Sequence, residues 1–85
     1  MIEIHWGHPL TYVVSQDGGT KKFTTIEQAG YWLRKKWPVQ DRNRDHAIAQ
    51  LEAAMHCLAP VGAARRAFIR AARSAGFRLD QAEAA

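Results

Sequence analysis

A chain of 85 residues has room for one hydrophobic core, so we expect a single small domain over 1–85, with an ordered core at about 6–79 and a short tail at 80–85. Hydrophobic residues make up 47% and charged residues 24% of the chain, which is typical of a folded domain and excludes general disorder. The net charge of +4 attracts anions but is low for a dedicated nucleic-acid-binding protein.

Apolar runs and cysteine content indicate the compartment. No basic start is followed by an apolar stretch, and no apolar run approaches the roughly 18–20 residues that span a bilayer. We therefore expect neither a signal peptide nor a membrane segment. The single cysteine, Cys57, cannot form an internal disulfide, so the reducing cytoplasm is the expected location.

The N-terminal part of the chain predicts a β-hairpin. Residues 9–15 are rich in β-branched and aromatic side chains, and their apolar residues alternate. An Asp-Gly-Gly turn signal at 17–19 precedes a return strand at 20–25. Because an isolated hairpin is marginally stable in water, we expect support from a covering helix or a third short strand, with 2–6 and 77–79 as the candidates.

A first helix is expected to begin after Thr25, because Thr25 and Gln28 have the spacing of a capping box. Pro38 disfavours helix at the residue before it and so ends the segment. The apolar stripe of this helix contains Ile26, Ala29, Gly30, Leu33 and Trp37.

Two further helices complete the predicted fold. Asp41 caps the second, which Pro60 terminates, and its apolar repeat consists of Ile48, Leu51, Met55 and Leu58. The third runs from 61 to 75, with Gly76 placed to end it in a left-handed conformation. A hairpin followed by three helices predicts an α+β fold in which helices cover one sheet face.

Arg66, Arg70 and Arg73 form one stripe of the third helix at i, i+4 and i+7. A solvated face is the favoured interpretation, and a phosphate-contacting surface is the alternative. Arg34 and Lys35 on the first helix could extend such a surface.

Arg65 differs from these three because it projects between Phe68 and Ile69, toward the apolar face of the third helix. An arginine in that position buries its stem and needs acceptors for its guanidinium group. We expect a structural role, and the candidate partners are Asp41, Asp45 and Glu27.

Aromatic residues allow two interpretations. Trp37 continues the apolar stripe of the first helix and is expected in the core. Tyr31 and Trp32 fall off that stripe, beside several cations. They either widen the core face or form an interface with a partner, and the sequence alone leaves both open.

Side chains that carry chemistry form no convincing site. Metal binding by His5 and His8 with His56 and Cys57 is not favoured, because adjacent residues on a helix diverge by about 100°. A second group of possible ligands lies on one arc of the second helix: Asp45, Glu52 and His56. These residues span too many turns to bind one ion, and we expect the arc to face the arginine helix and neutralise its charge. Cys57 fits a half-buried filler better than a nucleophile. We therefore expect no metal, no cofactor and no enzymatic activity.

Two segments together resemble a known family. The first, A-x(3)-L-x(3)-WP, consists of Ala29, Leu33, Trp37 and Pro38; the second, AR-x-AF-I-x-AA-x-x-AG, spans 64–76. Following a strand that begins with proline, they resemble a small bacterial family catalogued as domain of unknown function 982, over roughly 6–79. The resemblance implies a soluble, cytoplasmic single-domain protein and implies no activity, ligand or catalytic residue. We expect structural roles for the motif residues Arg65, Trp37, Pro38, Phe68 and Gly76.

The sequence favours a small interaction module that binds a protein partner or a second copy of itself, through Tyr31 and Trp32. The surplus of aromatic residues, Trp6 included, supports this interpretation. The alternative is a sequence-independent nucleic-acid-binding module, whose candidate contacts are Arg66, Arg70, Arg73, Arg34 and Lys35. No membrane partner is expected.

Overall fold

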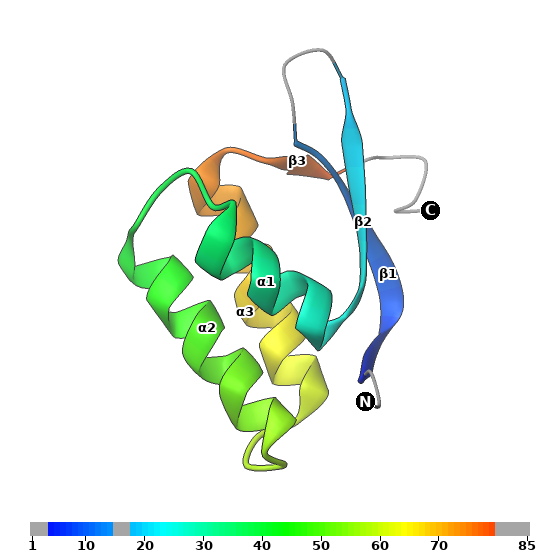
Figure 1. The fold of residues 1–85 in the computed structure, drawn as a ribbon, viewed down its shortest axis with the longest axis vertical. Coiled ribbons are helices and arrows are strands. Elements are labelled where there is room, and N and C mark those ends of the chain that lie inside the picture. The colour runs from blue at the N-terminus through cyan, green and yellow to red at the C-terminus, as the bar shows by residue number, and fades with distance from the viewer. Residues whose placement is uncertain (1–3, 15–17, 80–85) are drawn as a thin grey trace.

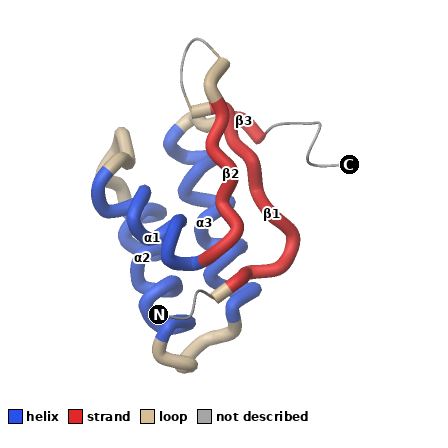
Figure 2. Tube along the Cα trace, turned by 45° about the vertical axis from the view of Figure 1, so that its right-hand side comes forward, coloured by secondary structure: helices blue, strands red, loops and turns tan. Residues whose placement is uncertain are grey.

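All three helices lie on the same side of a small antiparallel sheet, as Figure 1 and Figure 2 show. The computed structural model describes residues 4–14 and 18–79. The elements are, in chain order, β1 (His5–Val13), β2 (Thr20–Thr25), α1 (Ile26–Lys35), α2 (Arg42–Met55), α3 (Val61–Ala75) and β3 (Arg78–Leu79). Among the described residues the strand order is β2-β1-β3. The α+β fold predicted from the sequence is confirmed.

β1 begins at His5, four residues earlier than predicted, because the strand continues through a bulge in its pairing with β2. From His5 to Leu10 the chain advances five residues, while the paired β2 advances only two, from Thr25 to Phe23. Gly7 lies in this bulge with φ 96°, and Pro9 has no N–H to contribute to the ladder. In the segment at 2–6, one of the two candidates for a third strand, His5 and Trp6 belong to β1, and residues 2 and 3 lie outside the described residues.

The third strand is β3, at the second of the two predicted places. It pairs with β1 through Tyr12 opposite Leu79 and Val13 opposite Arg78. The predicted turn lies partly outside the described residues, which leave out 15–17. Within the described part, Val14 N–H donates to the Gly19 carbonyl at 2.9 Å and Gly18 has φ 91°.

The capping box before α1 is present in a shifted form. The Thr25 hydroxyl accepts from Gln28 N–H at 3.2 Å, and Gln28 Oε1 accepts from Thr24 N–H at 2.8 Å, one residue before the N-cap. The predicted stripe of α1 is buried at Ile26, Ala29, Gly30 and Leu33.

α2 begins as predicted, with the Asp41 carboxylate accepting from Arg44 N–H at 2.9 Å, but its apolar face and its end differ from the prediction. The helix ends at Met55, before Pro60, and Cys57 in the connection has φ 61°. Met55 and Leu58 are 42% and 80% exposed. The buried face consists of Ala47, Leu51 and Ala54. Two of these three residues are alanines, which allow α2 to pack closely against α3, its main neighbour.

α3 has the predicted bounds, and Gly76 ends it with φ 89°. Phe68, fully buried on α3, is the centre of an aromatic cluster. Its ring centroid lies 4.9 Å from Phe23, 5.2 Å from Trp6 and 5.5 Å from Trp37. α1 and α3 contact the strands, while α2 packs mainly on these two helices. This arrangement leaves the α1–α2 seam facing solvent, away from the sheet. No helix in the described part of the chain is long and apolar enough to cross a membrane.

Candidate functional site

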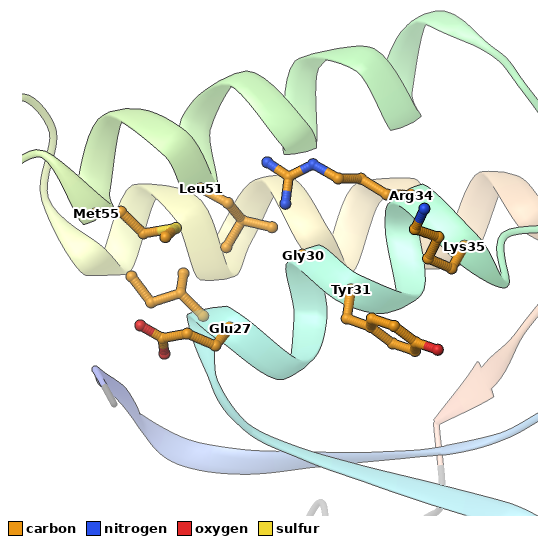
Figure 3. A pocket seen from close by; sticks show the side chains of 8 residues that line it. Glu27, Gly30, Tyr31, Arg34, Lys35, Leu51 and Met55 are labelled. Atoms are coloured by element: carbon orange, nitrogen blue, oxygen red, sulfur yellow. The ribbon is translucent and has the colours of Figure 1, made fainter. Parts of the chain in front are cut away.

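A groove of 260 Å³ lies on the surface between α1 and α2 (Figure 3). Its lining is mainly apolar and comes from the full length of α1 and the last part of α2: Ile26, Glu27, Gly30, Tyr31, Arg34, Lys35, Leu51 and Met55. Ile26, Gly30 and Arg34 follow one another at four-residue intervals on the same side of α1. Because Gly30 has no side chain, the space between Ile26 and Arg34 stays open. A Cβ built at Gly30 would meet only the Arg34 Nη1 atom, at 3.3 Å.

Charged groups border the groove along its length. Arg34 Nη2 on α1 pairs with Glu52 Oε1 on α2 at 2.7 Å. Both side chains are about half exposed, so this pair contributes at most about 1 kcal/mol to stability. Glu27 Oε1 accepts from the backbone N–H of Ile4 at 3.0 Å. Lys35 is exposed and makes no ion pair with a described residue.

The two aromatic residues predicted at an interface occupy different environments. Tyr31 is 54% exposed and lines the groove. Trp32 is half-buried, and its ring meets the Phe23 ring edge-on at 5.6 Å. Trp32 therefore widens the core face, and Trp6, 4% exposed, belongs to the core as well. Of the three aromatic residues cited for an interface, the structure leaves Tyr31 exposed.

The arginines of α3 divide as their helical positions predict. Arg66, Arg70 and Arg73 are exposed, and Arg65 is half-buried. Burial raises the pKa of Tyr12 on β1, and the positive charges of Arg65 and Arg73 partly oppose that increase. The positive charge of Arg65 therefore reaches Tyr12 on the sheet.

The three candidate carboxylates for Arg65 each have at least one contact with another residue. Asp41 accepts from Arg44 N–H and the Ser74 hydroxyl, and Asp45 lies 3.4 Å from Arg44 Nη1. Glu27 receives the N–H of Ile4. In the acidic arc on α2, which was expected to face the arginine helix, Glu52 pairs with Arg34 on α1.

The residues expected to be structural lie around the core. Phe68 is fully buried, and Trp37 packs against it and, edge-on at 5.0 Å, against Phe77. Pro38 is exposed in the connection after α1, and it lines a second, more polar pocket with Gly76 and the end of α3.

The chemical candidates among cysteine and histidine do not gather into a site. Cys57 is exposed, so its expected role as a half-buried filler is wrong. His56 beside it is also exposed, and the side chain of His8 lies outside what the structure describes. Within 4–14 and 18–79, no group of three His, Cys, Asp or Glu side chains is placed to hold a metal ion.

Sequence patterning misses the groove because its parts fall on two helices. Periodicity assigns the exposed Met55 to the buried stripe of α2, and no pattern within α1 shows which neighbour borders Gly30. A glycine on an apolar stripe next to an off-stripe tyrosine is the one available signal.

Comparison with known proteins identifies a family but no characterised relative. The family described as "Protein of unknown function (DUF982)" matches residues 8–79. Neither the curated proteins nor the solved structures contain a significant match to the chain.

Proposed function

The chain belongs to the DUF982 family of proteins of unknown function, and from this premise we propose that it is a small non-enzymatic interaction module that binds a protein partner. The groove between α1 and α2 is the single observation that carries this proposal. It combines an apolar floor at Ile26 and Leu51 with the exposed borders Tyr31 and Met55. An apolar depression bordered by exposed tyrosine and methionine has the composition of a protein interface.

The size of the groove favours an amino-acid side chain over a small-molecule ligand. Its volume of 260 Å³ is below the roughly 300–1,000 Å³ of sites that enclose drug-sized ligands. Two polar groups on its border, Glu27 and Arg34, already contact Ile4 and Glu52, so the exposed side chains of Tyr31 and Met55 supply most of the recognition. An apolar side chain from a partner would remove the exposed surfaces of Tyr31 and Met55 from water, since Ile26 and Leu51 beneath them are already buried.

Site-specific photo-crosslinking in cells that express the chain tests the proposal. A benzophenone amino acid at Tyr31 is expected to form a covalent adduct with a protein. The matched control is Ala49, an exposed position on α2 about 200° around the helix from Leu51. An adduct at both positions, or at neither, would overturn the proposal.

Sequence-independent nucleic-acid binding is the second candidate. The observation that favours it is the exposure of Arg66, Arg70 and Arg73 on one helix that contains no acidic residue. Cations at this spacing can contact successive phosphates. Arg34 is weakened as a member of this surface because it pairs with Glu52.

A further inference from the structure

We infer that the partner bound at this groove is a second copy of the chain, docked antiparallel across a two-fold axis that passes beside Tyr31. The inference rests on the proposed function, since it identifies the occupant of the same groove. Its basis is the order of three side chains along α1: Glu27, Tyr31 and Lys35.

Each of these residues is four positions from the next, so together they form a single stripe on α1. All three line the groove. Figure 3 shows Glu27 toward one end of the groove and Lys35 toward the other, with Tyr31 between them. Tyr31 is the midpoint of the stripe. A two-fold axis at Tyr31 therefore places Glu27 of each copy opposite Lys35 of the other, and the two tyrosines opposite each other. The stripe is self-complementary in charge in this orientation, whereas a parallel arrangement would place like charges together.

The charged ends of the stripe are available for these contacts. Lys35 is exposed and has no ion pair with a described residue, while the neighbouring Arg34 is held by Glu52. Glu27 uses one carboxylate oxygen, Oε1, for the Ile4 N–H. Its second oxygen can accept from a lysine of the other copy, because a carboxylate accepts several hydrogen bonds.

The apolar part of the interface uses the groove itself. Tyr31 is 54% exposed and is next to Gly30, which has no side chain to occupy the groove. Across the axis, the tyrosine ring of each copy packs at the groove of the other, against the exposed side chain of Met55. Tyrosine suits this position because its ring is apolar and its hydroxyl stays hydrated. The patch is small, so we expect a weak dimer with a Kd in about the micromolar range.

Charge exchange tests this arrangement by sedimentation equilibrium over a protein concentration series. The wild-type chain is expected to move from its monomer mass of 9.6 kDa toward twice that mass. Glu27→Lys and Lys35→Glu should each weaken association by about tenfold or more, because each puts like charges opposite one another at both ends. An equimolar mixture of the two variants should regain association, since every pair is then of opposite charge.

Two further variants separate charge from folding. Glu27→Gln keeps an acceptor for Ile4 N–H and removes the charge, so it should fold normally and dimerise less than wild type. Lys36→Glu changes an exposed cation one position off the stripe and should leave association unchanged. A folded wild type that stays monomeric, or a mixture that does not associate beyond the single variants, overturns the inference. In that case an adduct at Tyr31 with a different protein would leave the proposed function standing, and its absence would remove both.

Discussion

The Ser74 hydroxyl on α3 donates a hydrogen bond to Asp41, the residue that caps α2. One carboxylate thereby serves two helices: Oδ1 accepts from Arg44 N–H at the start of α2, and Oδ2 accepts from the end of α3. The hydrogen bond from Ser74, followed by those from the α2 backbone, lowers the pKa of Asp41 below its ordinary value of 3.8.

The lowered pKa of Asp41 predicts a pH dependence of stability with a definite sign. The unfolded chain takes up a proton at a higher pH than the folded chain does. The stabilising contribution is therefore complete above about pH 5 and is lost as the pH falls through 3.8 and then through the folded pKa. Asparagine caps helices as well as aspartate but does not titrate.

Urea unfolding of wild type and Asp41→Asn between pH 7 and about pH 2 measures this contribution. We expect the wild-type free energy of unfolding to fall more steeply with acid than that of the variant. Asp45→Asn, which changes an exposed carboxylate in the first turn of the same helix, is the control. Identical pH profiles for wild type and Asp41→Asn would contradict the prediction.

Phe68 is predicted to carry far more stability than the groove residue Tyr31. Phe68→Ala leaves a cavity among Trp6, Phe23 and Trp37, at a cost of about 3–5 kcal/mol, and Phe68→Leu should cost less and keep the fold. Tyr31→Ala changes an exposed ring and should alter the free energy of unfolding by no more than about 0.5 kcal/mol. Urea titrations followed by circular dichroism at low protein concentration measure both. A Tyr31→Ala loss as large as that of Phe68→Leu would show that Tyr31 is structural.

Two buried threonines should respond oppositely to the same substitution. The Thr11 hydroxyl is buried on β1 without a partner among the described residues, so Thr11→Val should raise the free energy of unfolding by about 1 kcal/mol. Thr25 is also buried, but its hydroxyl accepts from Gln28 N–H, so Thr25→Val should lower it by about 1 kcal/mol. Thermal or urea unfolding of the two variants is the measurement. If Thr11→Val also lowered the free energy of unfolding, the Thr11 hydroxyl would have a hydrogen-bond partner, contrary to the prediction.

The arginine surface of α3 is tested by its salt dependence. If Arg66, Arg70 and Arg73 contact phosphates, replacing all three with glutamine should reduce the slope of log affinity against log salt by about 0.9 per contact on duplex DNA. Titration of labelled single- and double-stranded nucleic acid across a salt series measures that slope. Arg34→Gln, which removes a cation already paired with Glu52, should change it little. No binding by the wild type at low salt would leave these arginines as a solvated face.

Local signals predicted the element boundaries that depend on local contacts. The caps at Thr25 and Asp41 and the left-handed Gly76 each act on groups within a few residues along the chain. Their positions therefore follow from spacing, and α1, α2 and α3 begin where the sequence indicated.

The predictions were wrong at positions whose structure depends on packing between segments that are distant in the sequence. The bulge in β1 depends on how the chain around Gly7 fits over β2, and it brings Trp6 into the core. On α2, the sequence pattern placed large side chains along the whole buried face, yet that face contains Ala47 and Ala54 beside the correctly predicted Leu51, and it packs on the alanines of α3. Met55, the last residue of α2, is exposed, and Leu58 is exposed because the helix ends before it.

The sequence by itself determined the fold class, the helix caps and the order of charges along α1, because propensity, capping and periodicity act over a few residues. Only the tertiary structure decided which of those residues border a common groove. Gly30 and Tyr31 on α1 line the same groove as Leu51 and Met55 on α2 because α2 packs on both α1 and α3. The position of the α1–α2 seam therefore depends on side-chain volumes in all three helices. The candidate site belongs to this seam, so no single segment of the sequence contains it.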